Sequence, residues 1–184
     1  MVGYVVVAVV VVAVLYAIAT YNRLVRQRNL VREGWSGIDV QLRRRADLVP
    51  NLVETVKGYA AHERGLFEEI AASRQQSLAA SAPAEQGQAE RRLEGALGRL
   101  MALAEAYPEL KADANFRQLQ GQLGEIEDQL QMARRYYNGT ARDLNTLVQS
   151  FPSNLVAGRF GFKEAEFFET DEASRAAPQV SFAR

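Results

Sequence analysis

The chain has 184 residues with 22 basic and 22 acidic side chains, so its formal net charge is zero. This balance gives no indication of a nucleic-acid partner, for which an excess of positive charge is typical. The absence of cysteine excludes disulfides, thiolate catalysis and cysteine-ligated metals. Beyond an apolar N-terminal stretch about 160 residues remain, which is enough for one domain of ordinary size.

The N-terminal stretch predicts a membrane anchor. Residues 2–20 contain no charged side chain, and at about 1.5 Å per residue a helix of this length spans a hydrocarbon core of about 30 Å. We therefore predict a transmembrane helix over residues 1–21. A cleaved signal peptide is the alternative, because Ala17-Ile18-Ala19 resembles a cleavage site. However, no basic residue precedes the stretch, and it exceeds the usual apolar length of about 7–15 residues.

Residues that favour a membrane interface follow this stretch. Tyr21 stands at its end, and Arg23, Arg26, Arg28 and Arg32 come next. We predict that Tyr21, Arg23, Arg26 and Arg28 are interface anchors. The positive-inside rule then places the N-terminus outside and the remainder of the chain in the cytoplasm.

The remaining sequence is predicted to be helical, because apolar residues recur three, four and seven positions apart. One stripe runs from Leu24 to about Ser77, with a kink at Pro50, and residues 81–87 form the first predicted reversal. A second helix is expected over residues 84–106. A third spans residues 116–151, where a heptad seam runs from Phe116 to Phe151 and winds left-handed around its partners.

These elements predict an all-α fold: an N-terminal transmembrane helix that continues into an antiparallel up-and-down bundle of three to four long helices. The predicted organisation is an anchor over residues 1–21, a bundle over residues 22–152 and an aromatic-containing C-terminal segment over residues 153–184. We expect a short docking helix at residues 164–168 and disorder in the last ten residues.

No motif in the sequence predicts catalysis. His62 is the only histidine, so one chain cannot build a site with two histidine ligands. The sequence contains no glycine-rich phosphate loop, no Gly-x-Ser-x-Gly and no dinucleotide fingerprint. We therefore expect no catalytic residue, no metal and no cofactor, and a protein that is not an enzyme.

Two groups of side chains are candidates for a functional surface. The polar group can form ion pairs along a solvated helix face, or, if it points inward, a network matched across helices by Glu105, Glu127 or Arg134 that fixes the bundle register or binds a partner. The second group consists of C-terminal aromatics. The polar candidates are Asp39, Arg43, Arg44, Arg45, Asp47 and Asn51, and the aromatic candidates are Phe160, Phe162, Phe167 and Phe168.

Several blocks of the sequence resemble the LemA family in order and spacing. They include Trp35-Ser36-Gly37-Ile38-Asp39, residues 44–53, and Tyr107-Pro108, Tyr137-Asn138 and Phe151-Pro152 in the second half. The resemblance covers residues 21–168. Gly34 departs from it, because the family usually has a better helix former there, and we expect this glycine to loosen its turn.

The resemblance implies a bacterial inner-membrane protein with a single span, and kinship with a magnetosome membrane protein that takes part in membrane organisation. It implies no catalytic residues. Some relatives replace the anchor with a lipoprotein signal, so a periplasmic bundle is the alternative orientation. We expect a scaffold that contacts the lipid bilayer and forms a homo-oligomer or recruits an unidentified protein, and that does not bind nucleic acid. The alternatives are a lipid- or small-ligand-binding membrane module and an accessory subunit of a membrane enzyme.

Overall fold

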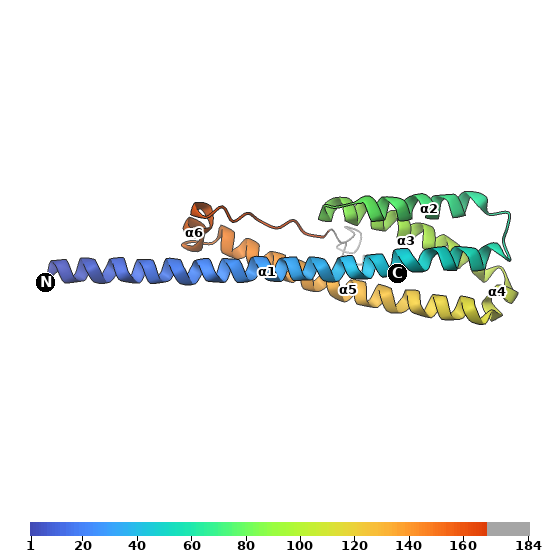
Figure 1. The fold of residues 1–184 in the computed structure, drawn as a ribbon, viewed down its shortest axis with the longest axis horizontal. Coiled ribbons are helices and arrows are strands. Elements are labelled where there is room, and N and C mark those ends of the chain that lie inside the picture. Colours follow the sequence, from blue (N-terminus) through green and yellow to red (C-terminus); the bar gives the residue numbers. More distant parts are fainter. Residues whose placement is uncertain (169–184) are drawn as a thin grey trace, which may run out of the picture.

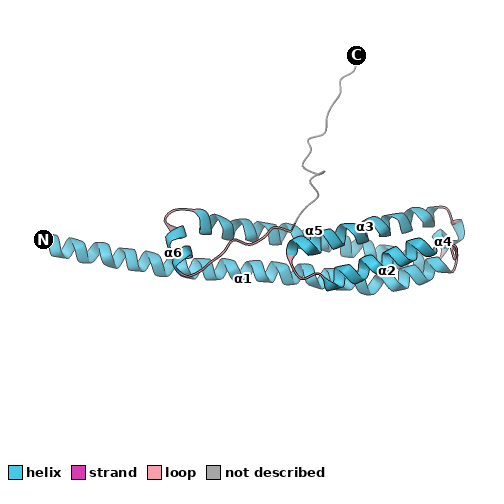
Figure 2. Cartoon of the chain, turned by 90° about the horizontal axis from the view of Figure 1, so that it is seen from above, coloured by secondary structure: helices cyan, strands magenta, loops and turns pink. Residues whose placement is uncertain are grey.

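The computed structural model describes residues 1–168, and this part of the chain is all-α (Figure 1). Its helices are α1 (Val2–Lys57), α2 (Arg64–Ala79), α3 (Pro83–Glu105), α4 (Pro108–Ala112), α5 (Ala114–Gln149) and α6 (Ser153–Arg159). The four long helices α1, α2, α3 and α5 form an antiparallel bundle, and the N-terminal part of α1 extends beyond it (Figures 1 and 2). The predicted fold class is confirmed.

Helix α1 continues through Pro50 instead of ending there. A proline has no backbone N–H, so the carbonyl of Ala46, four residues earlier, loses its helical donor. Arg74 of α2 replaces that donor: its Nε donates a hydrogen bond to the Ala46 oxygen at 2.5 Å. The proline is therefore accommodated by a contact between neighbouring helices.

The prediction that the first stripe runs to Ser77 was wrong, because the chain reverses earlier. α1 ends at Lys57, residues 58–63 form the connection, and α2 runs back along α1. Phe67 and Ile70 of α2 nevertheless pack into the same core as Val56 of α1. A hairpin of two helices that both face one core preserves the apolar spacing, which is why the pattern alone did not reveal the turn.

The bundle is elongated, and we call it the rod. Its core consists of three clusters stacked along its length. At the end far from the N-terminus, all four long helices contribute to one cluster. Closer to the N-terminus only α1 and α5 continue, because α2 and α3 are shorter. The clusters contain, in that order, Leu52, Ile70, Leu97 and Ile126; then Ile38, Leu42, Leu130 and Phe168; then Leu24, Leu144, Val156 and Phe162.

The C-terminal segment takes the place of α2 and α3 along the second half of the rod. After α6, residues 162–168, which we call the strap, run in irregular conformation along α1 and α5 towards the start of α3 (Figure 1). The short helix predicted at residues 164–168 is therefore wrong, and the segment's helix is α6 instead. The predicted seam also ends earlier than expected, because Phe151 is 79% exposed. The disorder predicted for the last ten residues lies outside the described part.

Gly34 does not loosen its turn, contrary to the expectation. It is buried at the contact between α1 and α5, and a Cβ at this position would lie 3.0 Å from the Cα of Tyr137 and 3.3 Å from Cδ1 of Tyr136. Only a residue without a side chain allows the two helices to approach this closely. The neighbouring Trp35 then packs against Tyr137, with ring centroids 5.5 Å apart.

Candidate functional site

A buried charge cluster connects the four long helices. Arg45 of α1 is fully buried and forms ion pairs with Glu90 of α3, which is 1% exposed, and with Glu127 of α5. The distance from Arg45 Nη1 to Glu127 Oε1 is 2.6 Å. α2 joins the cluster through Ser77, whose hydroxyl donates a hydrogen bond to Glu90. Because a buried charge is costly unless it is matched, this cluster ties the helices to one register.

Two further side chains complete the surroundings of the cluster. Gln86 donates hydrogen bonds from Nε2 to Glu90 Oε1 at 2.8 Å and to the Ser77 carbonyl at 3.1 Å. Arg134 of α5 lies near Arg45 and is partly buried. Burial lowers the pKa of the Arg134 guanidinium, and the nearby charge of Arg45 acts in the same direction. The carboxylates of Glu94 and Glu127 act in the opposite direction, so Glu127 lies near both Arg45 and Arg134.

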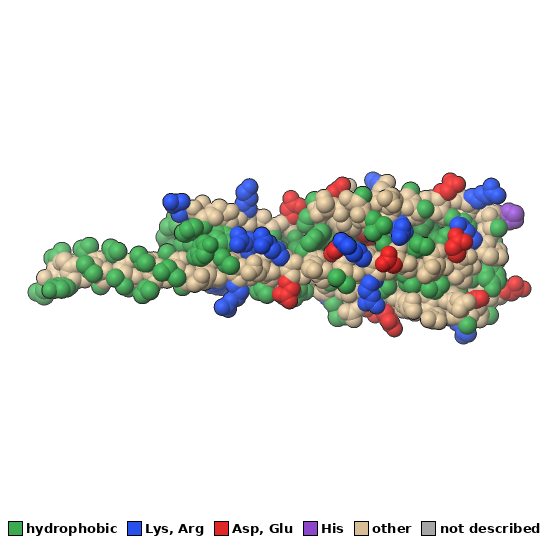
Figure 3. All heavy atoms as spheres, in the orientation of Figure 1, with side chains coloured by type: hydrophobic (Ala, Val, Ile, Leu, Met, Phe, Trp, Pro, Cys, Tyr) green, Lys and Arg blue, Asp and Glu red, His purple; other side chains and the backbone are tan. Residues whose placement is uncertain are grey.

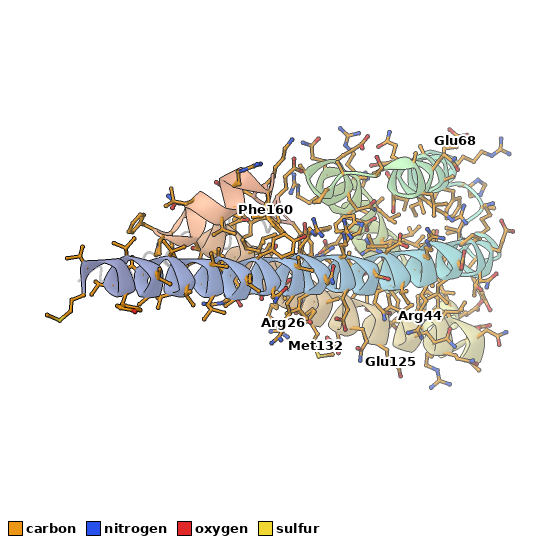
Figure 4. The ribbon with its side chains drawn as sticks, turned by 60° about the vertical axis from the view of Figure 1, so that its left-hand side comes forward. Arg26, Arg44, Glu68, Glu125, Met132 and Phe160 are labelled. Atoms are coloured by element: carbon orange, nitrogen blue, oxygen red, sulfur yellow. The ribbon has the colours of Figure 1, made fainter. Side chains whose placement is uncertain are left out.

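The other polar candidates on α1 lie at the surface and do not join Arg45. Asp39 and Arg43 form an exposed ion pair with an Oδ2 to Nε distance of 3.0 Å. Arg44 donates to Gln41 at 3.2 Å and points outward (Figure 4). Asp47 and Asn51 are also exposed. Both readings of this group therefore describe part of it, because one arginine enters the core and its neighbours form a solvated face.

A groove of about 430 Å³ adjoins this face. Its lining combines charged residues of α1 with the facing ends of α2 and α3: Asp39, Leu42, Arg43, Asp47, Ser77, Leu78, Ala80 and Gln86. Ser77 and Gln86 therefore connect the groove to the buried cluster. No group of three or more histidine, cysteine, aspartate or glutamate side chains within residues 1–168 is placed to hold a metal ion.

Glu90, Gln86 and Ser77 were not identified from the sequence, although a signal was present for Glu90. It precedes Leu93, Leu97 and Leu100 by three, seven and ten positions, which places a carboxylate on the apolar face of its helix. Arg45 likewise falls between Leu42 and Val49 on the stripe of α1. Two opposite charges, each on a buried face, indicate a pair across helices. Gln86 and Ser77 carry no comparable signal.

The strap is held by two asparagines of α5 that each bind its backbone twice. Asn145 donates to the carbonyl of Ala165 at 2.9 Å and accepts from the N–H of the same residue at 2.7 Å. Asn138 forms the same pair of hydrogen bonds with Phe168, at 3.0 and 2.9 Å. The Tyr137 hydroxyl adds a hydrogen bond to the carbonyl of Glu166 at 2.7 Å.

The spacing of the two asparagines fits an extended peptide. Seven residues along α5 span about 10.5 Å, and three residues of extended chain span about 10 Å, so both amides reach the strap in register. The order of the pairs shows that the strap runs antiparallel to α5. Burial raises the pKa of Tyr137, and the carboxylate of Glu166 acts in the same direction. The five hydrogen bonds that join the strap to Asn138, Asn145 and Tyr137 make it an integral part of the fold.

The four aromatic candidates divide into two pairs. Phe162 and Phe168 are buried within the chain, at 8% and 2% exposure. Phe162 lies beneath the Arg28 guanidinium, and the Arg134 guanidinium lies over Phe168, each 5.0 Å from the ring centroid. Phe160 and Phe167 remain 58% and 45% exposed. Only the second pair is available to a partner in this conformation.

The candidate interface residues lie where the rod narrows to α1 alone. Tyr21 contacts Phe160 and Phe162 edge to face, with centroids 4.9 and 5.8 Å apart. Arg23 and Arg26 are exposed on α1. Beyond them the space-filling view shows an apolar projection without charged side chains (Figure 3). Within the described residues, α1 is the one helix that is long and apolar enough to cross a membrane, and its apolar stretch is not buried by the bundle.

The structural class is an elongated four-helix bundle whose first helix, α1, extends beyond it as an apolar stretch. A buried charge cluster joins the four helices. The chain belongs to the LemA family, which it matches over residues 34–182. It is 27% identical to magnetosome protein MamQ 2 of Paramagnetospirillum magneticum and 26% identical to magnetosome protein MamQ of Magnetospirillum gryphiswaldense, over 83% of this chain and 66% of each relative. It is 24% identical to protein LemA of Metamycoplasma hominis, over 84% of this chain and 71% of that relative.

Proposed function

We propose that the protein is a non-enzymatic scaffold that projects a rigid rod from the bacterial inner membrane and presents it to copies of itself or to a protein partner. One observation carries this proposal: α1 passes without a break from its exposed apolar stretch into the bundle, where it packs along α5. A continuous helix transmits position and tilt from the membrane to the rod. The magnetosome relatives support a role at a membrane.

The orientation of the bundle is part of this proposal. Four arginines, Arg23, Arg26, Arg28 and Arg32, follow the apolar stretch, which favours a cytoplasmic bundle. A protease added to intact spheroplasts is expected to leave the bundle undigested, and digestion is expected once detergent opens the membrane. Loss of the bundle in intact spheroplasts would instead establish the periplasmic orientation.

Self-association is expected to depend on the bundle and its exposed aromatics. Phe167 is 45% exposed at the described end of the strap, and aromatic side chains commonly dominate interface energies. Deletion of residues 1–20 should leave the oligomer intact in solution, and Phe167→Ser should weaken it. Analytical ultracentrifugation of the full chain in detergent and of the shortened chain in buffer measures both effects.

A matched control separates this role from a general loss of apolar surface. Met132 on α5 has the same exposure, 45%, and Met132→Ser should leave the assembly unchanged. Phe168→Ser is unsuitable, because that ring is part of the core. A shortened chain that remains monomeric at high micromolar concentration would contradict assembly through the bundle and would shift the argument to contacts between the membrane spans.

A further inference from the structure

The most exposed apolar side chains beyond the stretch of α1 gather around α6. Within residues 21–168, Phe151 is 79% exposed, Leu155 65% and Phe160 58%, and no other large apolar side chain there exceeds 50%. The opposite side of α6 is buried, with Val156 and Ala157 packed into the core. The segment 151–160, which we call the α6 foot, therefore packs on the bundle with one side and leaves an apolar side uncovered.

The α6 foot lies beside the apolar stretch of α1. Figure 4 shows Phe160 next to α1, on the N-terminal side of the bundle. Ala17 of α1 packs against the core cluster that contains Val156. An apolar recess of about 260 Å³ has a lining of Val14, Ala17, Ile18, Tyr21 and Phe160. Phe160 is therefore level with the last turns of the stretch that is long enough to cross a membrane.

Cations predominate around the foot. Residues 150–163 contain Arg159 and Lys163, both exposed, and no acidic residue, and the first carboxylate after them is the exposed Glu164. Arg23 and Arg26 add exposed cations at the same level of α1. Apolar side chains combined with neighbouring cations are typical of protein segments that lie in the interface of an anionic bilayer.

We propose that the α6 foot inserts Phe151, Leu155 and Phe160 into the interfacial layer of the bilayer that α1 crosses, with Arg159 and Lys163 at anionic lipid headgroups. The proposal rests on the transmembrane role of α1 and adds a second point of attachment to it. A single helix can tilt and rotate in a bilayer, whereas two attached points limit both motions. The foot would thus fix the angle at which the rod leaves the membrane.

A bilayer fits this surface better than a second copy of the chain does. Phe160 shares its recess with Val14 and Ile18, which face acyl chains when α1 crosses the membrane. A protein that covered Phe160 would have to enter the hydrocarbon beside α1. When α1 crosses the membrane, lipid occupies that position, and anionic headgroups complement the arginines.

The absence of cysteine in the chain allows a direct test by site-specific labelling. A fluorescent probe is attached to the full-length protein through Leu155→Cys, Val10→Cys or Gln122→Cys in vesicles of equal parts phosphatidylcholine and phosphatidylglycerol. Lipids that carry a nitroxide near the headgroup or in the middle of the acyl chain then quench the probe according to its depth. Gln122 is exposed on α5, far from the foot.

We expect the headgroup-level nitroxide to quench the Leu155 probe several-fold more than the Gln122 probe, and the mid-chain nitroxide to quench the Val10 probe most. Combined Arg159→Gln and Lys163→Gln substitutions should lower quenching at Leu155.

If the probe at Val10 is quenched but the probes at Leu155 and Gln122 behave alike, the insertion of the foot is overturned, whereas the transmembrane role of α1 is retained. Absence of quenching at Val10 overturns the anchor itself. A Leu155 probe that is shielded from water, is not quenched by either lipid nitroxide and cross-links between chains assigns the surface to a second copy and overturns the proposal.

Discussion

Arg45→Met is expected to lower the free energy of unfolding of the bundle by about 3–5 kcal/mol, because it removes one partner of a buried ion pair. The carboxylate of Glu90 would remain at 1% exposure without its cation. Hydrogen bonds from Ser77 and Gln86 would still reach this carboxylate but would not neutralise its charge. Urea unfolding of the full chain in detergent, followed by the fluorescence of Trp35, measures the loss.

Two controls separate this effect from a general effect of arginine removal. Arg43→Met, two residues earlier, changes a side chain that is 71% exposed and should shift stability by less than about 0.5 kcal/mol. The double variant Arg45→Met with Glu90→Leu replaces the pair by apolar groups and should recover most of the loss, because such replacements are often neutral or stabilising. An Arg45→Met variant as stable as Arg43→Met would show that the buried charge cluster does not stabilise the bundle.

The apolar patterns of the sequence were sufficient to predict the class of fold and most of the helices. The seam of α5 was predicted well, since residues such as Leu130 and Leu144 are buried as their spacing requires. The turn at residues 58–63 was missed because α2 continues the apolar spacing of α1 on the other side of the same core. A periodic pattern defines which face is apolar, but it does not define which way the chain runs.

The candidate site was predicted only in part, for a related reason. Arg45 was among the polar candidates and Glu127 among its possible partners, but the pairing of Arg45 with Glu90 depends on how α3 is placed against α1. The strap was predicted as an aromatic segment, and its attachment to Asn138 and Asn145 was not. That attachment depends on the match between helical rise and extended rise, which becomes apparent only when the two segments are known to be antiparallel neighbours.

Gly34→Ala is expected to destabilise the bundle by about 1–3 kcal/mol, the usual cost of overpacking a close contact. The added Cβ would lie 3.0 Å from the backbone of Tyr137, and a backbone atom cannot move aside as the end of a flexible side chain can. α1 and α5 would have to separate where Trp35 packs against Tyr137. Thermal unfolding followed by far-ultraviolet circular dichroism is the suitable measurement, because Trp35 is too close to the substitution to report stability alone.

Gly37→Ala, one turn further along α1, provides a control of opposite sign. Nothing lies within 4 Å of a Cβ at Gly37, so alanine there should raise stability by up to about 1 kcal/mol through its higher helix propensity. The same chemical change in the same helix is therefore expected to be unfavourable at one position and favourable at the other. Stabilisation at both positions would mean that α1 and α5 do not approach as closely as the structure shows, and the glycine would then act through backbone flexibility, as the sequence alone suggested.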